Sequence, residues 1–537
     1  MSLSRFCTDV FINGNIRRHC SVNATHESRN LTESKFKIFF KVDTMTEELL
    51  TQVIRDIHME SSPEPDAWDP PDKMKSLTDE CLLRIFSCLD FKAICRSSCV
   101  CKRWYVIGKD RSLWRTVNLS PMKQEFNEGD VIKLVKARLH FTRKLNIGNL
   151  KVNHRFLRFL EKQCPHLRIL IFGPDSSVQM PSRRLTVFDF PKRIETLDLR
   201  HVAGDFDFLI RSNRTYYNIH NIGIGRFLFT QTDLTLLFAK LPNLAIVDLT
   251  NCVEFDDNGL KVLATSCPNM ESLCLIGCRG IQGKTFHTLL KYCWNLKTLL
   301  LRYLKFQDHV LTQNIWRESV IEELDISACP KITWQGLFSF LTQLKHVKYL
   351  NMSYCGEGHA VNDAVLWELG NKGVAERLVM LDLRWSFHLT PNALFNFVKR
   401  CKKIEYLGLY QSVQVGADNI AALVGNLPKI KVLEYGGSLP QFLSDSKIIP
   451  KLMTFSKKIE VLSLINFTTQ SKKDDYKFLK AFMRKSKHLR RINFCDCSPD
   501  LVKVGSEAAK KIHRVKVTMK WECALPPPNL TLDSIVL

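Results

Sequence analysis

Short apolar runs recur along most of this chain at a nearly constant interval, and this period limits the folds that the chain can adopt. In the central part the runs begin at Val247, Leu273, Leu299, Leu324 and Leu350, which are 26, 26, 25 and 26 residues apart. Further runs begin at Leu381, Leu407, Leu433, Leu462 and Ile492, and weaker copies begin at Leu145, Ile169, Leu197 and Ile222. A period of 20 to 29 residues is typical of stacked repeats rather than of one globular core. We therefore expect about fourteen repeat units.

The pattern inside each unit predicts one short strand and one helix. Runs such as VDLTNC and LCLIGC alternate apolar and polar residues, as a strand with one buried face does. The segments Asp256 to Met270 and Lys284 to Leu296 have apolar residues at helical spacing. The sequence therefore predicts an α/β solenoid in which parallel strands line a curved inner face and helices cover the outside.

Cysteines fit the same pattern. Cys252, Cys278, Cys329 and Cys355 follow strands, whereas Cys164, Cys267, Cys293 and Cys401 end helices. A small, weakly polar side chain suits both buried positions, so we expect reduced, structural thiols. The pairs Cys99/Cys101 and Cys495/Cys497 are too closely spaced for a usual zinc site, and no metal is expected.

The stretch from Leu77 to Trp114 has a different character. Thr78 is a suitable N-cap, and Asp79 and Glu80 place negative charge in the first turn of a helix. Apolar residues then recur at helical spacing through Leu89 and again from Val100. About forty residues cannot bury so many large side chains on themselves, so this segment is expected to bind a partner.

These residues resemble the F-box. The resemblance rests on Leu77 with Glu80, on Leu82 to Phe86, on Leu89-Asp90, on the VCKRW segment that begins at Val100, and on Leu113-Trp114, although Thr78 replaces the usual proline. It implies binding to the Skp-type adaptor of an SCF ubiquitin ligase and, through the adaptor, to cullin and RING subunits. The residues expected to bind the adaptor are Leu77, Leu82, Leu83, Ile85, Phe86, Leu89, Val100, Trp104, Leu113 and Trp114.

The repeats, in turn, resemble the cysteine-containing leucine-rich repeats that are commonly attached to F-boxes. The expected organisation is a largely flexible region over 1–76, an F-box over 77–120, a repeat solenoid over 121–522 and a tail over 523–537. The apolar end of the tail is expected to cover the last repeat. The resemblance implies a substrate-recognition subunit of a ubiquitin ligase, which recruits protein targets for degradation and is not itself an enzyme.

The inner face of the solenoid is the expected binding surface for that target. The strand positions between the buried leucines point to this face. These positions and the residues just after them give the candidates Arg302, Tyr303, Arg384, Trp385, Tyr410 and Glu434. Arginine and aromatic residues are favoured at the centres of protein interfaces, and arginine binds carboxylate or phosphate with two points of contact. We therefore expect an acidic or phosphorylated protein segment as the bound feature. A merely solvated polar face is the alternative.

Composition adds a second hypothesis for the function. The chain has a net charge of +23, while residues 1–76 contain ten basic and twelve acidic residues. A basic repeat scaffold that acts in protein interaction independently of the ligase is therefore the alternative. No catalytic, cofactor-binding or nucleotide-binding motif is present, and nucleic acid is not an expected partner. Without an apolar run long enough to span a bilayer, the protein is expected in the cytoplasm or the nucleus.

Overall fold

The computed structural model describes residues 77–120, 128–173, 177–179, 191–202, 215–225, 230–412, 422–442, 458–469, 471–510, 512, 514–519 and 528–536. All of these belong to one compact unit, Asp56–Leu537. The region 1–76, which the sequence predicts to be flexible, lies outside the described residues. No helix in the described ranges is long and apolar enough to cross a membrane.

The described chain begins with a small helical domain. Its elements are α5 (Asp79–Phe86), α6 (Phe91–Ser98), α7 (Lys102–Gly108) and the 3₁₀ helix η1 (Arg111–Trp114). Thr78 caps α5 as the sequence predicts, since its hydroxyl accepts a hydrogen bond from the backbone N–H of Cys81. Asp90 caps α6 in the same way and ends the preceding turn.

A single parallel sheet of sixteen strands follows, with the strands in chain order apart from β3 and β5. Its strands are β1 (Thr116–Asn118), β2 (Lys144–Asn146), β4 (Ile169–Ile171), β6 (Thr196–Leu199), β7 (Asn221–Ile224), β8 (Ile246–Asp248), β9 (Ser272–Cys274), β10 (Thr298–Leu300), β11 (Glu323–Asp325), β12 (Tyr349–Asn351), β13 (Met380–Asp382), β14 (Tyr406–Gly408), β15 (Val432–Phe442), β16 (Val461–Thr468), β17 (Arg491–Cys495) and β18 (Lys516–Thr518). The strands β3 (Lys151–Asn153) and β5 (Ser177–Gln179) form a separate pair.

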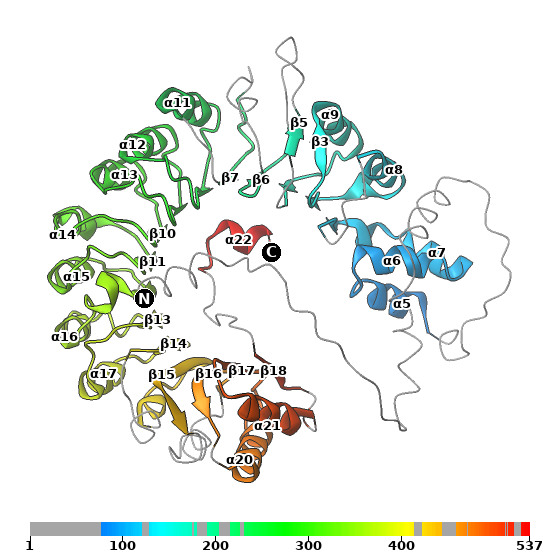
Figure 1. Cartoon of the computed structure of the whole chain (residues 1–537). Helices are drawn as coiled ribbons and strands as arrows, with labels where there is room; N and C mark the ends of the chain where they lie inside the picture. Colours follow the sequence, from blue (N-terminus) through cyan, green and yellow to red (C-terminus); the bar gives the residue numbers. More distant parts are fainter. Residues whose placement is uncertain are drawn as a thin grey trace. The chain divides into compact units, whose positions relative to one another are not determined.

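Helices connect the strands and cover one face of the sheet (Figure 1). They are α8 (Glu128–Arg138), η2 (Leu139–Phe141), α9 (His154–Gln163), α11 (Gln231–Ala239), α12 (Asp257–Ser266), α13 (Phe286–Tyr292), α14 (Asp308–Leu311), η3 (Asn314–Glu318), α15 (Trp334–Leu341), η4 (Cys355–Gly358), α16 (Asp363–Asn371), α17 (Pro391–Val398), α20 (Lys472–Lys485) and α21 (Pro499–Lys510). The last helix, α22 (Leu532–Val536), follows the last strand and lies on the other face of the sheet. This arrangement confirms the predicted α/β solenoid. The face of the sheet opposite to the connecting helices is called the inner face below.

Strand register explains why the period is so regular. Leu299 pairs with Leu273 on one side and Leu324 on the other, and all three are fully buried beneath the helices. The predicted start at Ile169 was wrong by one residue, because Leu170 is the residue in register with Leu145. A slip of one residue exchanges the two faces of a strand, and Leu170 is the buried residue of this pair. The strands β1 and β18 add two units to the fourteen that the sequence predicts.

Buried thiols tie successive units together. Cys278 donates to the carbonyl of Leu249 at 3.0 Å, and Cys355 donates to that of Ile326 at 2.9 Å, each across to the preceding unit. Burial raises the pKa of Cys164, Cys267, Cys293 and Cys401 to about 12. All sixteen cysteines in the described part of the chain are free, and the predicted structural role of the eight repeat cysteines is confirmed.

The end of the chain does not cover the last repeat, and that prediction was wrong. The helix α22 contacts β7 and β8, far from β18 (Figure 1). Leu532 is buried, and its methyl group fills the space beside Gly223 where any larger residue would clash. Several hydrogen bonds also hold residues 528–536, called the C-terminal segment below, on the inner face. Polar groups that the middle strands offer there, rather than apolar surface on the last unit, determine where this segment binds.

Candidate functional site

Half of the predicted adaptor-binding residues form the core of the helical domain. The buried ones are Leu82, Phe86, Trp104, Leu113 and Trp114. Phe86 and Trp104 pack edge to face with ring centroids 5.5 Å apart. The indole N–H of Trp114 donates to the carbonyl of Gly108 at 2.8 Å. These side chains therefore hold α5, α6, α7 and η1 together and are not an exposed binding surface in this structure.

The remaining predicted residues are accessible on the surface of the domain. Ile85 is 36% exposed, while Leu77, Leu83, Leu89 and Val100 are half-buried. Val106, on α7, is 68% exposed and was not predicted from the sequence. These side chains are accessible for contact with a partner, whereas the buried ones are not.

An ion pair fixes α5 against α7. The guanidinium of Arg103 lies 2.7 Å from the carboxylate of Asp79 and also donates to the carbonyl of Leu77. The first turn of α5 is thereby held beside α7, the helix that carries Val106.

Three arginines occupy equivalent positions on the inner face, each three residues after the buried leucine of its strand. They are Arg200, Arg302 and Arg384, which follow β6, β10 and β13. Arg200 and Arg384 lie in the same tetrapeptide, LDLR, and each binds the aspartate of its own strand through two guanidinium nitrogens. Bidentate pairs of this kind are short and directional.

Arg384 is fully engaged within the sheet. It is 5% exposed and lies 2.6 Å from Asp382 and 3.1 Å from Glu434, two strands away. The hydroxyl of Tyr406 donates to Glu434 at 2.9 Å. A buried arginine with two carboxylate partners is already neutralised, which leaves little attraction for an anion on a partner.

Arg302 is more open. Its side chain is 29% exposed and binds Asp325 at 2.6 Å, and Asp325 also accepts a hydrogen bond from Asn351. Burial opposes the charge of Arg302, but the carboxylate of Asp325 outweighs it and raises the pKa above the usual range. The Nε atom of Arg302 is buried and has no hydrogen-bond partner among the described residues. Beside it, burial raises the pKa of Tyr303 to about 12.

Aromatic residues gather where strands β12 to β14 end. Trp385 packs edge to face against Tyr410 at 5.3 Å and Tyr354 at 6.2 Å. Tyr303, Tyr354 and Trp385 adopt left-handed backbone angles that turn the chain out of the strand. The ring N–H of Trp385 has no hydrogen-bond partner in the described structure. Tyr410 is 5% exposed, so Trp385 is the more accessible member of the predicted pair.

The C-terminal segment occupies part of the same face. Asp533 lies 2.7 Å from Arg200, which also binds Asp248 at 2.9 Å. Burial opposes the charge of Arg200, and the three neighbouring aspartates raise its pKa above the usual range. The backbone and side chain of Asn529 donate to Glu323 on β11, and Lys144 on β2 donates to the carbonyl of Ile535. The inner face therefore binds the C-terminal segment through backbone groups, the side chain of Asn529 and the carboxylate of Asp533 on α22.

Comparison with known proteins identifies the helical domain. Residues 76–120 match the family model described as F-box-like. The chain therefore contains an F-box-like domain, followed by the solenoid of α/β repeats described above. Its F-box-like domain is the part shown above to have a complete core and exposed apolar residues on α5 and α7.

Two solved structures share a partial similarity with this chain. One is the Rad7 and Elc1 complex in yeast, with 15% identity, a TM-score of 0.36, and coverage of 76% of this chain and 94% of the other. The second is the TLR13–ssRNA13 complex, with 14% identity, a TM-score of 0.32, and coverage of 70% and 59%. Both TM-scores are low, and the solenoid is defined by its own strand register.

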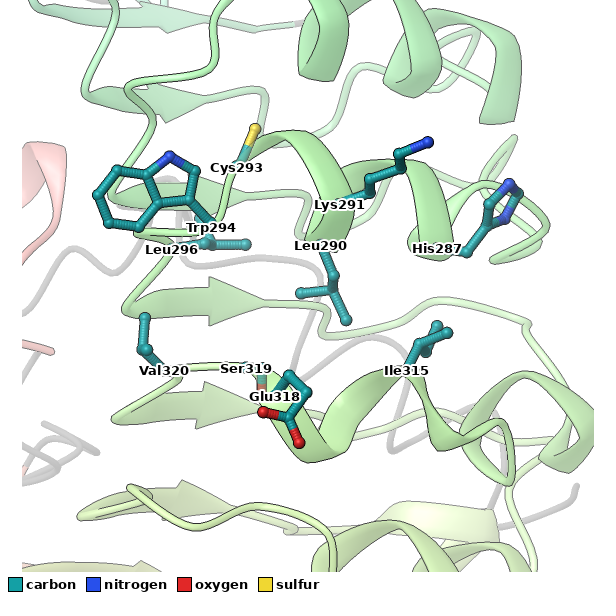
Figure 2. A pocket seen from close by; sticks show the side chains of 10 residues that line it. All are labelled: His287, Leu290, Lys291, Cys293, Trp294, Leu296, Ile315, Glu318, Ser319 and Val320. Atoms are coloured by element: carbon teal, nitrogen blue, oxygen red, sulfur yellow. The ribbon is translucent and has the colours of Figure 1, made fainter.

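A groove of about 290 Å³ on the outer side lies between α13 and η3 and contains a cysteine and a histidine (Figure 2). Cys293 is 1% exposed, and burial raises its pKa to about 12. Figure 2 shows His287 well away from Cys293, and His287 contacts Lys284 and Thr288 instead. The pair therefore lacks the geometry and the thiolate that nucleophilic catalysis requires. In the described ranges, no group of three or more potential metal ligands gathers.

The predicted substrate residues thus divide by accessibility. Arg302, Tyr303 and Trp385 are accessible, whereas Arg384, Tyr410 and Glu434 are buried. Their role in target binding stays a prediction. Sequence reasoning missed Arg200, although the shared LDLR tetrapeptide at 197–200 and 381–384 was a visible signal.

Proposed function

We propose that this protein is the substrate-recognition subunit of an SCF-type ubiquitin ligase. In this role the F-box-like domain binds a Skp-type adaptor and thereby cullin and RING subunits, and the repeats bind the protein target. The observation that carries the proposal is the F-box-like domain itself, which keeps its core internal and leaves Ile85 and Val106 exposed on two packed helices. The chain contributes binding only, since ubiquitin transfer belongs to the recruited subunits.

An acidic or phosphorylated segment of the target is the proposed ligand of the inner face. The contact between Arg200 and Asp533 supports this chemistry, because the face already accommodates a carboxylate, which is carried by the short helix α22. Arg302 is better suited than Arg384 to bind a target anion, since it has one carboxylate partner and 29% of its side chain is exposed. The accessible Trp385 and Tyr303 supply apolar contact beside it.

A basic scaffold that acts without the ligase is the second candidate. The net charge of +23 favours it, because strongly basic surfaces associate with acidic partners without a dedicated site. Thr78, which replaces the usual proline, is compatible with both functions, since it caps α5 adequately.

Copurification separates the two candidates. The full chain, bearing a small affinity tag, is expressed in cells and recovered at low salt, and the bound proteins are quantified by mass spectrometry. Recovery of a cullin and a Skp-type adaptor with the wild-type chain, and their loss with Ile85→Asp, is the expected result. A well-folded preparation with acidic proteins bound and neither ligase subunit present would support the scaffold instead.

A further inference from the structure

The residues that immediately precede the strands form a second column of aligned side chains, called the leading edge here. The carbonyl of Arg115, before β1, accepts from the N–H of Arg143, before β2, at 2.8 Å. The carbonyl of Arg143 accepts in turn from Arg168, before β4, at 2.8 Å. The same bond recurs from strand to strand, so the backbones of neighbouring leading-edge residues lie about 4.8 Å apart and their side chains can reach each other.

Along most of the leading edge, neighbouring charges are opposite and paired. The ion pairs are Arg168–Glu195 at 3.0 Å, Glu271–Lys297 at 2.9 Å, Glu322–Lys348 at 2.8 Å, Glu405–Lys431 at 2.6 Å and Glu460–Arg490 at 3.9 Å. This pattern avoids like charges on adjacent strands, which repel each other.

The start of the leading edge breaks this pattern, since Arg115, Arg143 and Arg168 are consecutive and all positive. Arg168 pairs with Glu195, which leaves Arg115 and Arg143. In the part of the chain that the structure describes, neither forms an ion pair with a carboxylate. Asp110 is the acidic group on the same element, but its carboxylate accepts hydrogen bonds from the N–H and hydroxyl of Ser112 at 2.8 and 2.6 Å. Those bonds are the main reason that its pKa is lowered, and Arg111 and Arg115 contribute less.

These arginines line a hollow of about 250 Å³ together with Arg111, Phe141 and His166. The guanidinium of Arg111 lies 5.8 Å from the centre of the Phe141 ring, and that ring stacks on His166 at 5.9 Å with an angle of 15°. The aromatic rings therefore provide one wall for the cations. Three guanidinium groups and an imidazole line the hollow, and none of the described lining residues is acidic.

We propose that this hollow is a binding site for a phosphate group. Arginine forks match the oxygens of phosphate, and a phosphate monoester carries close to two negative charges at neutral pH. A single carboxylate would compensate only one of the three arginines. Two arginines come from the end of the F-box-like domain and one from before β2, so a bound phosphate bridges η1 and the first strands of the repeat sheet. This site does not depend on the proposed ligase function.

The test uses the full chain and compares two double variants. Arg115→Gln with Arg143→Gln removes two charges from the hollow and is called the hollow variant below. Lys297→Gln with Lys348→Gln removes two charges from the same leading edge where both lysines are paired, and it is the matched control. Inorganic phosphate, with chloride at equal ionic strength as the reference, is titrated by calorimetry and by thermal unfolding. A labelled peptide with one phosphoserine, and its glutamate counterpart, are titrated by fluorescence anisotropy.

The expected result is that phosphate raises the melting temperature of the wild type and the control but not of the hollow variant. Binding of inorganic phosphate should weaken at least tenfold in the hollow variant. Equal loss for the phosphoserine peptide would identify a phosphorylated side chain as the source, while binding of inorganic phosphate alone would identify a free phosphate.

Equal phosphate binding by all three proteins, or no binding by the wild type, would overturn the proposal. In chloride alone the hollow variant should unfold at or slightly above the wild-type temperature, because repulsion between Arg115 and Arg143 is removed. Should it unfold earlier, Arg111→Gln, which changes an exposed residue outside the strands, replaces it in the same comparison.

Discussion

Arg200, which follows β6, forms an ion pair of 2.7 Å with Asp533 of the C-terminal segment. Arg200 is also bound to Asp198 and Asp248, so Asp533 is its third carboxylate partner. The side chain of Asp533 is 52% exposed, unlike those of the other two aspartates. This contact is therefore the one that a competing anion reaches most easily.

Release of the C-terminal segment is expected when the charge of Asp533 is reversed. In Asp533→Lys the new cation faces Arg200 and repels it, although Leu532 remains apolar. Hydrogen exchange of the amides of residues 528–536 should become faster. Asp500→Lys makes the same charge change on the outer helix α21, where Asp500 pairs with Lys472, and it should leave this exchange unchanged. Slow exchange retained in Asp533→Lys would show that the remaining contacts, the buried Leu532 and the hydrogen bonds of Asn529 with Glu323, hold the segment without the ion pair.

Arg384 and Arg302 should differ in their effect on stability. Arg384→Leu leaves Asp382 and Glu434 buried without a cation, which should cost about 3–5 kcal/mol of the free energy of unfolding. Arg302→Leu removes one partner from Asp325, which keeps the hydrogen bond from Asn351, and should cost about 1.5–3 kcal/mol. Urea denaturation followed by tryptophan fluorescence measures both. Equal losses, or a larger loss for Arg302→Leu, would contradict the burial and pairing described here.

Alkaline pH should destabilise the repeats through their buried thiols. Burial raises the pKa of Cys164 and Cys401 in the folded chain to about 12, from 9.0 for an exposed thiol. Below pH 9 each thiol is protonated in both the folded and the unfolded chain, so stability is unaffected. Between pH 9 and 12 the thiols of the unfolded chain lose their protons while those of the folded chain keep them. The free energy of unfolding therefore falls by about 1.4 kcal/mol per pH unit for each thiol.

Urea denaturation at pH 8.5 and 10.5 measures this loss. Because lysines and tyrosines also titrate there, the double variant Cys164→Ala and Cys401→Ala is compared with the wild type. The double variant should lose less stability between the two pH values. The same loss of stability in both proteins would mean that burial does not keep these thiols protonated at pH 10.5.

The sequence predicted the solenoid well because its strongest signal, the repeat of buried leucines, reflects the strand register directly. Leu273, Leu299 and Leu324 are paired as their spacing implies. The first strand was missed because β1 lies within the segment that resembles an F-box, so its short run TVN was attributed to the helical domain. The shift at Ile169 arose because Leu167, Ile169, Leu170 and Ile171 offer two apolar alternations, and only neighbouring strands decide between them.

The candidate sites were harder to predict, because accessibility depends on contacts between distant residues. Helical spacing placed Phe86 and Ile85 in one apolar stripe, but Phe86 packs on Trp104 in the core while Ile85 reaches the surface. An arginine on the inner face looks available in the sequence, yet Glu434 binds Arg384 from two strands away. The position of the C-terminal segment depends on Glu323 and Arg200, and no local pattern indicates that contact.

The affinity of the purified chain for a Skp-type adaptor tests the central claim most directly. Calorimetric titration should give a complex with the wild type. Ile85→Asp, which puts a charge on an exposed side chain and leaves the buried Phe86 and Trp104 in place, should weaken binding by ~30-fold or more. Lys102→Ala, at the start of α7, is the control and should bind nearly as tightly as the wild type. Adaptor binding that is absent from the folded wild type, or unchanged in Ile85→Asp, would contradict the account.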